Sequence, residues 1–220
     1  MLTIKKCIYF AFQSTFYCVK KQNELETLQD IKSMMQRSSR FISLSGLSGI
    51  AAGCCALIGA AIAYPIVSGR AARGDYYTLP ELRSLFWVGA GTLFAAIVFA
   101  ILFTYLKSKK NQIPIWGSTS RRMLWSLFIP LITGGVVLAR LVSLSHFGLV
   151  APGCLIFYGI ALFSARQQTL DEIKYLGYAE IILGVIALWN LGYGLYFWTV
   201  GFGFFHIIYG IWMWHKYERR

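Results

Sequence analysis

The chain has 220 residues, of which 57% are hydrophobic and 14% are charged, whereas a soluble domain averages about 25% charged residues. This deficit of charge excludes an ordinary soluble domain, because much of the surface must face something other than water. The net charge is +12, but Lys and Arg cluster at the ends of apolar segments, as in membrane proteins, so we expect no nucleic-acid binding.

Residues 1–21 contain an apolar run, 7–19, with a pair of Lys residues on either side. The run is too short to span a bilayer and lacks a small-residue cleavage site. A signal-peptide-like segment and an interfacial helix are both open interpretations. We favour a poorly ordered or mis-annotated extension, with translation beginning at Val19.

Residues 22–40 predict an amphipathic helix on the cytosolic side. Asn23 is a suitable N-cap with Glu26 three residues later, and acidic residues precede basic ones along the segment. The apolar stripe of this helix consists of Leu25, Leu28, Ile31 and Met35. The stripe can lie on the lipid headgroups, pair with a second copy of the chain, cover the cytosolic end of the bundle or dock on a protein partner. The mixed charges of the polar face favour docking, because lipid-binding helices concentrate Lys and Arg there.

Residues 41–66 form the first predicted membrane span, with 26 residues and no charge. As a helix this stretch would reach about 39 Å, more than the hydrocarbon core of about 30 Å. Ser45, Gly49 and Gly53 repeat every four residues, so they form a face of small residues. Such a face predicts close packing against another helix.

Five further apolar segments predict an all-α fold, a polytopic membrane helix bundle of about six transmembrane helices. The expected spans after the first are 85–106, 123–145, 147–163, 176–198 and 199–214, followed by a tail, 215–220. If the N-terminus is cytosolic, 17 of the 21 Lys and Arg residues lie on cytosolic segments and 3 on outer loops. This bias predicts a multi-pass protein of the cell membrane with both termini cytosolic.

Two charged residues, Arg140 and Glu180, lie inside predicted spans, where charges are costly and are functional candidates. Counting about 1.5 Å per residue places Arg140 in the outer half of the membrane and Glu180 near the inner headgroups. We therefore do not expect these two residues to pair. Instead, we expect Glu180 to meet Lys or Arg of the 107–122 loop.

The same count gives Asn190 and His206 depths that match Arg140, with Tyr193 nearby. The sequence thus predicts a small polar ligand site in the outer half of the bundle, formed by Arg140, Asn190, His206 and Tyr193. The alternative is that Arg140 extends towards the headgroups while Asn190 and His206 bond neighbouring backbone.

We predict no catalytic residues, no metal and no cofactor. The histidines are His146, His206 and His215, without HExxH spacing, and the predicted topology puts the first and last at opposite membrane faces. No GxSxG or Gly-rich phosphate loop occurs. The five cysteines form no CxxC pair, so no structural disulfide is expected.

The run ELETLQDIKSMMQRSSRFISLSGLSGIAAG, residues 24–53, resembles the opening of a family of small, uncharacterised bacterial six-span membrane proteins. The resemblance implies a similar set of spans but no established activity. Some members carry a label as carotene oxygenases, which are expected to hold iron with about four histidines. This chain has three histidines at mismatched depths, so we do not adopt that label.

The sequence favours a non-enzymatic binding, scaffold or regulatory component, because the spans contain few polar residues and no catalytic constellation. The alternative is a small transporter or channel that uses the predicted outer-half site. A third hypothesis is a membrane enzyme acting on lipid.

Overall fold

The computed structural model of the protein describes residues 45–73, 77–111, 117–169 and 172–218. They all belong to one compact unit, Phe41–Arg220. The predicted extension 1–21 and amphipathic helix 22–40 lie outside the described residues, as does the stripe of Leu25, Leu28, Ile31 and Met35.

The described residues form an all-α bundle, as the composition predicted. Its elements are α2 (Gly46–Arg73), α3 (Leu79–Asn111), α4 (Ser118–Ser143), η1 (Phe147–Leu149), α5 (Val150–Ala165), α6 (Ile173–Leu188), η2 (Leu191–Tyr193), α7 (Gly194–Trp198), the π-helical η3 (Thr199–Phe205) and α8 (His206–Tyr217). Within this part of the chain, five segments are long and apolar enough to cross a membrane: Gly46–Gly69, Leu79–Lys110, Thr119–Ser143, Phe147–Ala165 and Leu191–Tyr217. The polytopic helical fold class is therefore confirmed.

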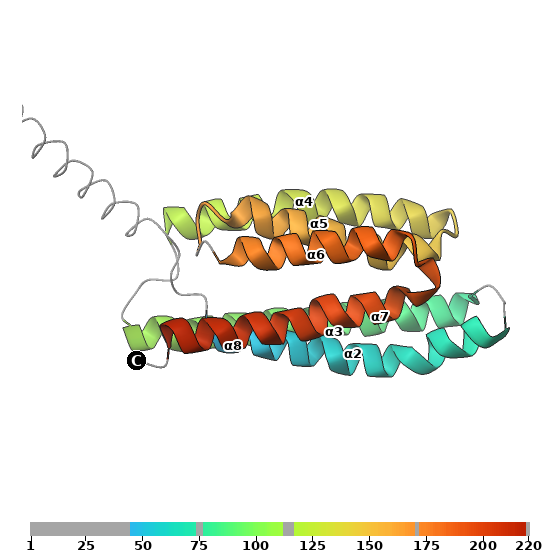
Figure 1. Ribbon diagram of the computed structural model, residues 1–220, viewed down its shortest axis with the longest axis horizontal. Coiled ribbons are helices and arrows are strands. Elements are labelled where there is room, and N and C mark those ends of the chain that lie inside the picture. The colour runs from blue at the N-terminus through green and yellow to red at the C-terminus, as the bar shows by residue number, and fades with distance from the viewer. Residues whose placement is uncertain (1–44, 74–76, 112–116, 170–171, 219–220) are drawn as a thin grey trace, which may run out of the picture. The chain divides into compact units, whose positions relative to one another are not determined.

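Helix α6 is the short member of the bundle. Its 16 residues would reach about 24 Å, less than the hydrocarbon core of about 30 Å. It nevertheless runs beside α5 along its length (Figure 1). Its buried positions fall on one face at helical spacing, namely Ile173, Leu176, Gly177, Glu180, Gly184 and Ala187. A polar residue thus occupies the middle of a packed face.

The boundary between the last two predicted spans is wrong. We expected segments 176–198 and 199–214, but α6 ends at Leu188 and the last helical segment begins at Leu191. Glycines lie on both sides of the expected boundary, and only the first pair, Gly192 and Gly194, lies at the turn. Gly201 and Gly203 are buried inside the helical segment, where their lack of a side chain permits close packing.

The helices pack as two groups. Helix α2 packs on α3 and on α8 and η3, while α5 packs on α4 and α6. Figure 1 shows α4, α5 and α6 together, and α2, α3 and the segment from α7 to α8 together. The groups meet where α7 and η3 contact α5 and α6. They also share an apolar cluster of Leu162, Ile173, Leu176, Tyr209 and Met213.

The backbones of α2 and the last helical segment approach each other through glycines. A Cβ atom on Gly49 would lie 3.2 Å from Gly210 Cα, and one on Gly53 would lie 2.7 Å from the Gly203 carbonyl oxygen. Ser45, the third member of the predicted small-residue face, is buried at the same contact and bonds to Glu218. All three residues therefore face the last helical segment.

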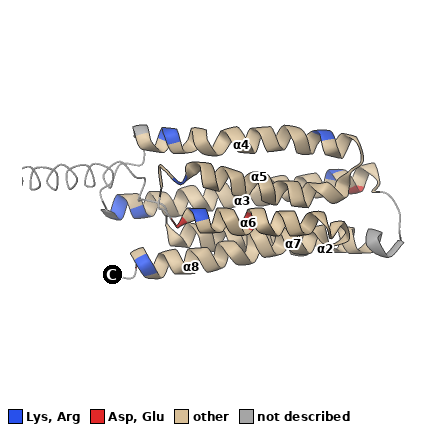
Figure 2. Cartoon of the chain, turned by 45° about the horizontal axis from the view of Figure 1, so that its top comes forward, with Lys and Arg blue, Asp and Glu red and all other residues tan. Residues whose placement is uncertain are grey.

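The outward faces of α3 and α4 are apolar and exposed, including Leu93, Phe94, Ile101, Ile129 and Val136. A surface of this extent is suited to hydrocarbon and not to water. Lys and Arg of the described residues lie towards the helix ends (Figure 2). This distribution of charge is the one that membrane-spanning helices require.

Candidate functional site

Glu180 is a fully buried acidic side chain in the middle of α6, with an exposed fraction of 0%. Neither carboxylate oxygen has a hydrogen-bond partner among the described residues. Burying a carboxyl group without such partners opposes folding. Stability therefore does not explain the residue, and an ionisable group inside a membrane bundle is a functional candidate.

His206, the first residue of α8, faces Glu180. Its Nδ1 atom lies 3.5 Å from Glu180 Oε1, which is within range of an ion pair but too long for a good hydrogen bond. The same nitrogen lies 3.1 Å from the Gly201 carbonyl oxygen, and Nε2 lies 2.7 Å from the Tyr158 hydroxyl. Because a carbonyl only accepts, these partners assign the hydrogen to Nδ1, and the Tyr158 hydroxyl donates to Nε2.

The π-helix η3 supplies the backbone of the site. Single π-turns within helices are frequent at functional sites, and this one ends directly before His206. A Cβ atom on Gly201 would lie 2.5 Å from both Glu180 Oε2 and Leu155 Cδ2. A side chain at this position would therefore force the ends of the Glu180 and Leu155 side chains to move.

Aromatic rings surround the polar groups. The Phe202 ring lies 5.0 Å from the Tyr158 ring and 5.9 Å from the His206 ring, measured between centroids. Trp198 extends this layer, with its ring 5.1 Å from that of Phe202. Because Glu180 and His206 are both buried, the pair lies in a low-dielectric environment.

The site joins the two groups of helices. Glu180 and Tyr158 come from α6 and α5, whereas His206 and Gly201 come from the last helical segment. A relative movement of the two groups would therefore change the distance between the carboxylate and the imidazole. The arrangement can take up and release a proton, since it combines a carboxyl, an imidazole and a phenol. In the described part of the chain, no group of three or more His, Cys, Asp and Glu could hold a metal ion.

The structure does not assemble the predicted outer-half pocket. Arg140 is exposed and donates to Ser143 Oγ at 3.3 Å, and Asn190 is exposed and donates to the Ile186 carbonyl at 3.1 Å. Tyr193 is 62% exposed and packs on Tyr196. All four predicted residues, Arg140, Asn190, His206 and Tyr193, are described, and no hydrogen bond, ion pair or ring contact joins any two of them.

The misplaced helix boundary explains the wrong depth of His206. This residue lies 15 residues after Leu191, about 22 Å along the segment, and so farther from its start than we expected. The prediction for Glu180 is also wrong, because its side chain faces His206 and not the basic 107–122 loop. Lys107, which lies in α3, instead pairs with the carboxylate of Glu218, at 3.0 Å. Periodicity alone could have shown Glu180 on the packed face of α6 with Leu176 and Gly184.

A second polar cluster ties the end of α8 to both groups of helices. We call Lys216, Tyr217 and Glu218 the terminal clasp. Lys216 Nζ and the Tyr217 hydroxyl, the latter at 2.8 Å, donate to Glu172 Oε1 at the start of α6. Partial burial alone would raise the pKa of Glu172, but the hydrogen bonds from Lys216 and Tyr217 outweigh it and lower the pKa.

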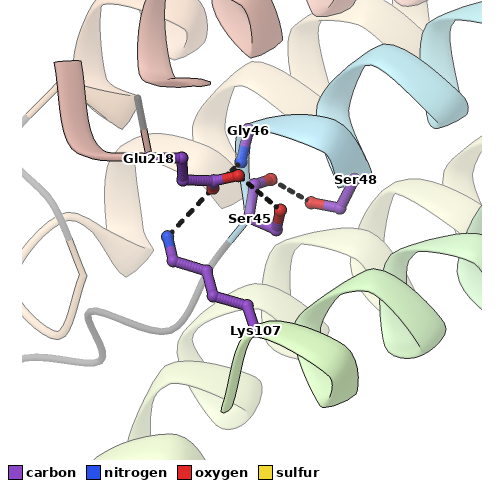
Figure 3. Close-up of polar contacts among 5 residues, drawn as sticks. All are labelled: Ser45, Gly46, Ser48, Lys107 and Glu218. Carbon is purple, nitrogen blue, oxygen red and sulfur yellow. Dashed lines mark hydrogen bonds and ion pairs between the residues drawn. The ribbon is translucent and has the colours of Figure 1, made fainter. Parts of the chain in front are cut away.

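Glu218 makes the other half of the terminal clasp (Figure 3). Its carboxylate accepts from the Gly46 N–H at 2.7 Å and from Ser45 Oγ at 3.2 Å, and it pairs with Lys107 Nζ at 3.0 Å. A carboxylate at the first turn of α2 also suits the helix dipole. Three consecutive residues thus connect α6 on one side with α2 and α3 on the other.

No protein-family model, curated protein or solved structure matches the chain. The expected kinship with small six-span bacterial membrane proteins stays a prediction.

Proposed function

We propose that the protein is a small proton-coupled membrane transporter, and that Glu180 and His206 bind the proton. The observation that carries this proposal is the fully buried Glu180 carboxyl, which lacks hydrogen-bond partners among the described residues and lies 3.5 Å from His206 Nδ1. The sequence offered two main hypotheses, a scaffold component and a small transporter or channel. This proposal is the second of them, but its site consists of different residues from the predicted ones.

The chemistry of the pair supports proton coupling. With one proton on the carboxyl and a neutral imidazole, or with a carboxylate and an imidazolium, the site has no net charge. Loss of one proton leaves a net negative charge, which is costly inside a bilayer. Binding of a proton therefore changes the energy of keeping the two groups of helices together around the site.

The position of the pair supports coupling to movement. Binding sites of many secondary transporters lie where two groups of helices meet, beside a helix whose regular hydrogen bonding is interrupted. Here the π-helix η3 interrupts the last helical segment next to Glu180. This support is an analogy with transporters in general and identifies no substrate.

We propose a location in the bacterial inner membrane, which the resemblance of residues 24–53 implies, with both termini cytosolic. The support for the orientation is the charge bias, since 17 of 21 Lys and Arg residues lie on segments that this topology makes cytosolic. Contact with the lipid bilayer is supported by the exposed apolar faces of α3 and α4. A scaffold role through residues 22–40, by self-association or a protein partner, stays a prediction because this segment lies outside the described residues.

The first test measures whether Glu180 exchanges a proton. Infrared difference spectra of the purified full-length protein, recorded from about pH 5 to about pH 9, should contain a carboxyl band that titrates and that disappears in Glu180→Gln. Glu81→Gln, which changes an acidic residue at the start of α3, is the matched control and should retain the band. If no band assigned to Glu180 titrates while the protein stays folded, the proposal is wrong.

The second test looks for coupled transport. Everted membrane vesicles that contain the protein would be given a pH gradient, followed by a panel of small solutes and an acridine dye that reports the gradient. At least one solute should dissipate the gradient in wild-type vesicles and not in Glu180→Gln vesicles. The responding solute would then define the substrate class.

A further inference from the structure

We infer that the contact of Glu172 with Lys216 and Tyr217 is a gate, which separates the Glu180–His206 pair from the water at the end of the bundle that carries the terminal clasp. This inference rests on the proposed function, because a gate matters only if Glu180 exchanges its proton with water. It goes further by naming the contact that opens and the turn about which the helices move.

Three layers lie between the clasp end and the buried pair. Along α6, Glu172, Leu176 and Glu180 follow one another at four-residue spacing, so about 12 Å separates the first from the last. In the first layer, two donors from the end of α8 bond to Glu172. The apolar cluster that contains Leu176 forms the second layer, and the pair of Glu180 and His206 forms the third.

Each layer joins the same two groups of helices. The first and third layers both connect α6 with α8. The apolar cluster is divided in the same way, with Leu162, Ile173 and Leu176 on one side and Tyr209 and Met213 on the other. Because one boundary passes through all three layers, a single movement of the two groups would open them together.

The two halves of the terminal clasp differ in this respect. Glu218 bonds to Gly46 of α2 and to Lys107 of α3, so its contacts stay within the group of helices that contains α8. Glu172 belongs to α6, so its bonds to Lys216 and Tyr217 cross between the groups. Opening of the gate would therefore break the bonds of Glu172 and leave those of Glu218 intact.

The turn between α6 and the last helical segment is suited to be the hinge. It lies at the end of the bundle opposite the C-terminus (Figure 1). The chain passes between the groups through two residues, 189–190, at this turn, and through six, 112–117, at the clasp end. Because a shorter connection allows less separation, the groups can part more easily at the clasp end. Gly192 lies in the turn, where a Cβ atom would meet nothing within 4 Å, so this backbone has room to move.

A small rotation about this hinge is enough to open the gate. Helix α6 is about 24 Å long, so a rotation of about 10° would move its first turn by about 4 Å. Such a shift exceeds the 2.8 Å between the Tyr217 hydroxyl and Glu172 Oε1, so the hydrogen bond would break. Hinge movements of this kind at the ends of helices are common in switching proteins.

The test measures how fast a small, charged methanethiosulfonate reagent labels Leu176→Cys in the full-length protein in lipid nanodiscs. Leu176 is 6% exposed and lies behind the gate, so the reagent reaches residue 176 when the gate opens. Mass spectrometry assigns the label to this residue and so separates it from the native cysteines. Adding Glu172→Gln should raise the labelling rate about tenfold, because hydrogen bonds to a charged acceptor are about twice as strong as neutral ones.

A second variant and two controls make the test specific. Lys216→Gln combined with Tyr217→Phe removes the donors and should raise the labelling rate at residue 176 as Glu172→Gln does. Glu218→Gln removes the other carboxylate of the terminal clasp and should leave that rate unchanged. Ala60→Cys, 5% exposed on α2, whose neighbours are α3 and the last helical segment, should be labelled equally slowly in every variant.

Two results would overturn the gate. One is a wild-type labelling rate at residue 176 in both Glu172→Gln and the donor variant. The other is an equal rise at residue 60, which would mean that the bonds of Glu172 hold the whole bundle and not one boundary. Neither result depends on the titration of Glu180, so a failure of the proposed function would be seen separately, as the absence of a titrating Glu180 band.

Discussion

Gly201 lies directly against the carboxylate of Glu180. A Cβ atom at residue 201 would lie 2.5 Å from Glu180 Oε2, a distance that real side chains cannot adopt. The backbone of the π-helix and the buried acid of α6 therefore depend on each other for space, although they belong to different groups of helices.

Replacement of this glycine should disturb the site. Gly201→Ala forces the carboxylate or the helix to shift, so we expect the titration midpoint of Glu180 to move and the stability to fall by about 1–3 kcal/mol. Infrared titration and thermal unfolding in detergent measure the two effects. Gly192→Ala, where a Cβ atom would meet nothing within 4 Å, is the control. A Gly201→Ala protein with wild-type titration and stability would contradict this account.

The glycine contact between α2 and the last helical segment should not tolerate bulk. Gly49→Leu and Gly53→Leu place a large side chain against the backbone of Gly210 and Gly203, and we expect each to destabilise the bundle by about 1–3 kcal/mol or more. The effect should exceed that of Leu57→Ala. The measurement is the fraction of monodisperse protein recovered in detergent and its melting temperature.

Gly89→Leu is the matched control for this contact, because a Cβ atom at that glycine of α3 would meet nothing within 4 Å. We expect this variant to extract and melt like the wild-type protein. If Gly89→Leu and Gly49→Leu lower the recovery and the melting temperature equally, leucine is harmful at any helical glycine. The result would then give no evidence for close packing at Gly49.

The ionic part of the terminal clasp should contribute measurably to stability. Glu218→Gln weakens the bonds to Gly46 and Lys107, which have lengths of 2.7 Å and 3.0 Å. We expect a loss of about 1–2 kcal/mol, since charged hydrogen bonds at partly buried sites have about this strength. Lys107→Gln should lower the melting temperature, whereas Lys110→Gln, in the last turn of the same helix, should not. If Glu218→Gln, Lys107→Gln and Lys110→Gln all have the same melting temperature, the contacts of the terminal clasp do not stabilise the bundle.

The bonds of Glu172 should make stability depend on pH in the acidic range. Hydrogen bonds from Lys216 and Tyr217 lower its pKa in the folded protein, so the folded state favours the carboxylate. The resulting stabilisation is present above the ordinary glutamate pKa of about 4.3 and is lost as the pH falls through the lowered pKa. The melting-temperature difference between wild type and Glu172→Gln should be constant near neutral pH and disappear in acid. A melting-temperature difference between wild type and Glu172→Gln that grows as the pH falls would contradict this prediction.

The topology can be checked independently of the site. Reporter fusions after residues 40 and 220 should both give a cytosolic signal, and an insertion near residue 74 should give an external one, because Lys and Arg accumulate on the cytosolic side. An external signal at either terminus would mean that the number of spans has been misassigned.

The bundle was predictable because long uncharged runs such as 41–66 can satisfy their backbone in a membrane only as helices. The close approach at Gly49 and Gly53 follows from their four-residue spacing. The sequence did not predict the turn at 189–193, because the pair Gly192 and Gly194 has the same spacing as the pair Gly201 and Gly203. Either pair could have marked the turn. Their roles differ only once neighbouring helices are present.

The site could be predicted only in part. His206 was expected to be a site residue, but its partners were not, because the last helical segment begins at Leu191 and not at Thr199, which changes the depth of His206. Glu180 was expected at the headgroups, since counting along one helix does not reveal what the facing helix presents. Tyr158 carried no signal of its own, and the π-helix has no sequence pattern that distinguishes it from an α-helix.

The π-helix also sets the rotational phase of everything that follows it. An α-helix turns the chain by about 100° per residue, and the wider π-turns of Thr199–Phe205 turn it by less. If this stretch became α-helical with the same number of residues, α8 would rotate as a unit. His206, Tyr209 and the terminal clasp would then lose their contacts with α5 and α6 together, although none of them had been substituted. A chain that keeps these contacts with a regular α-helix here should therefore have one residue fewer along this stretch.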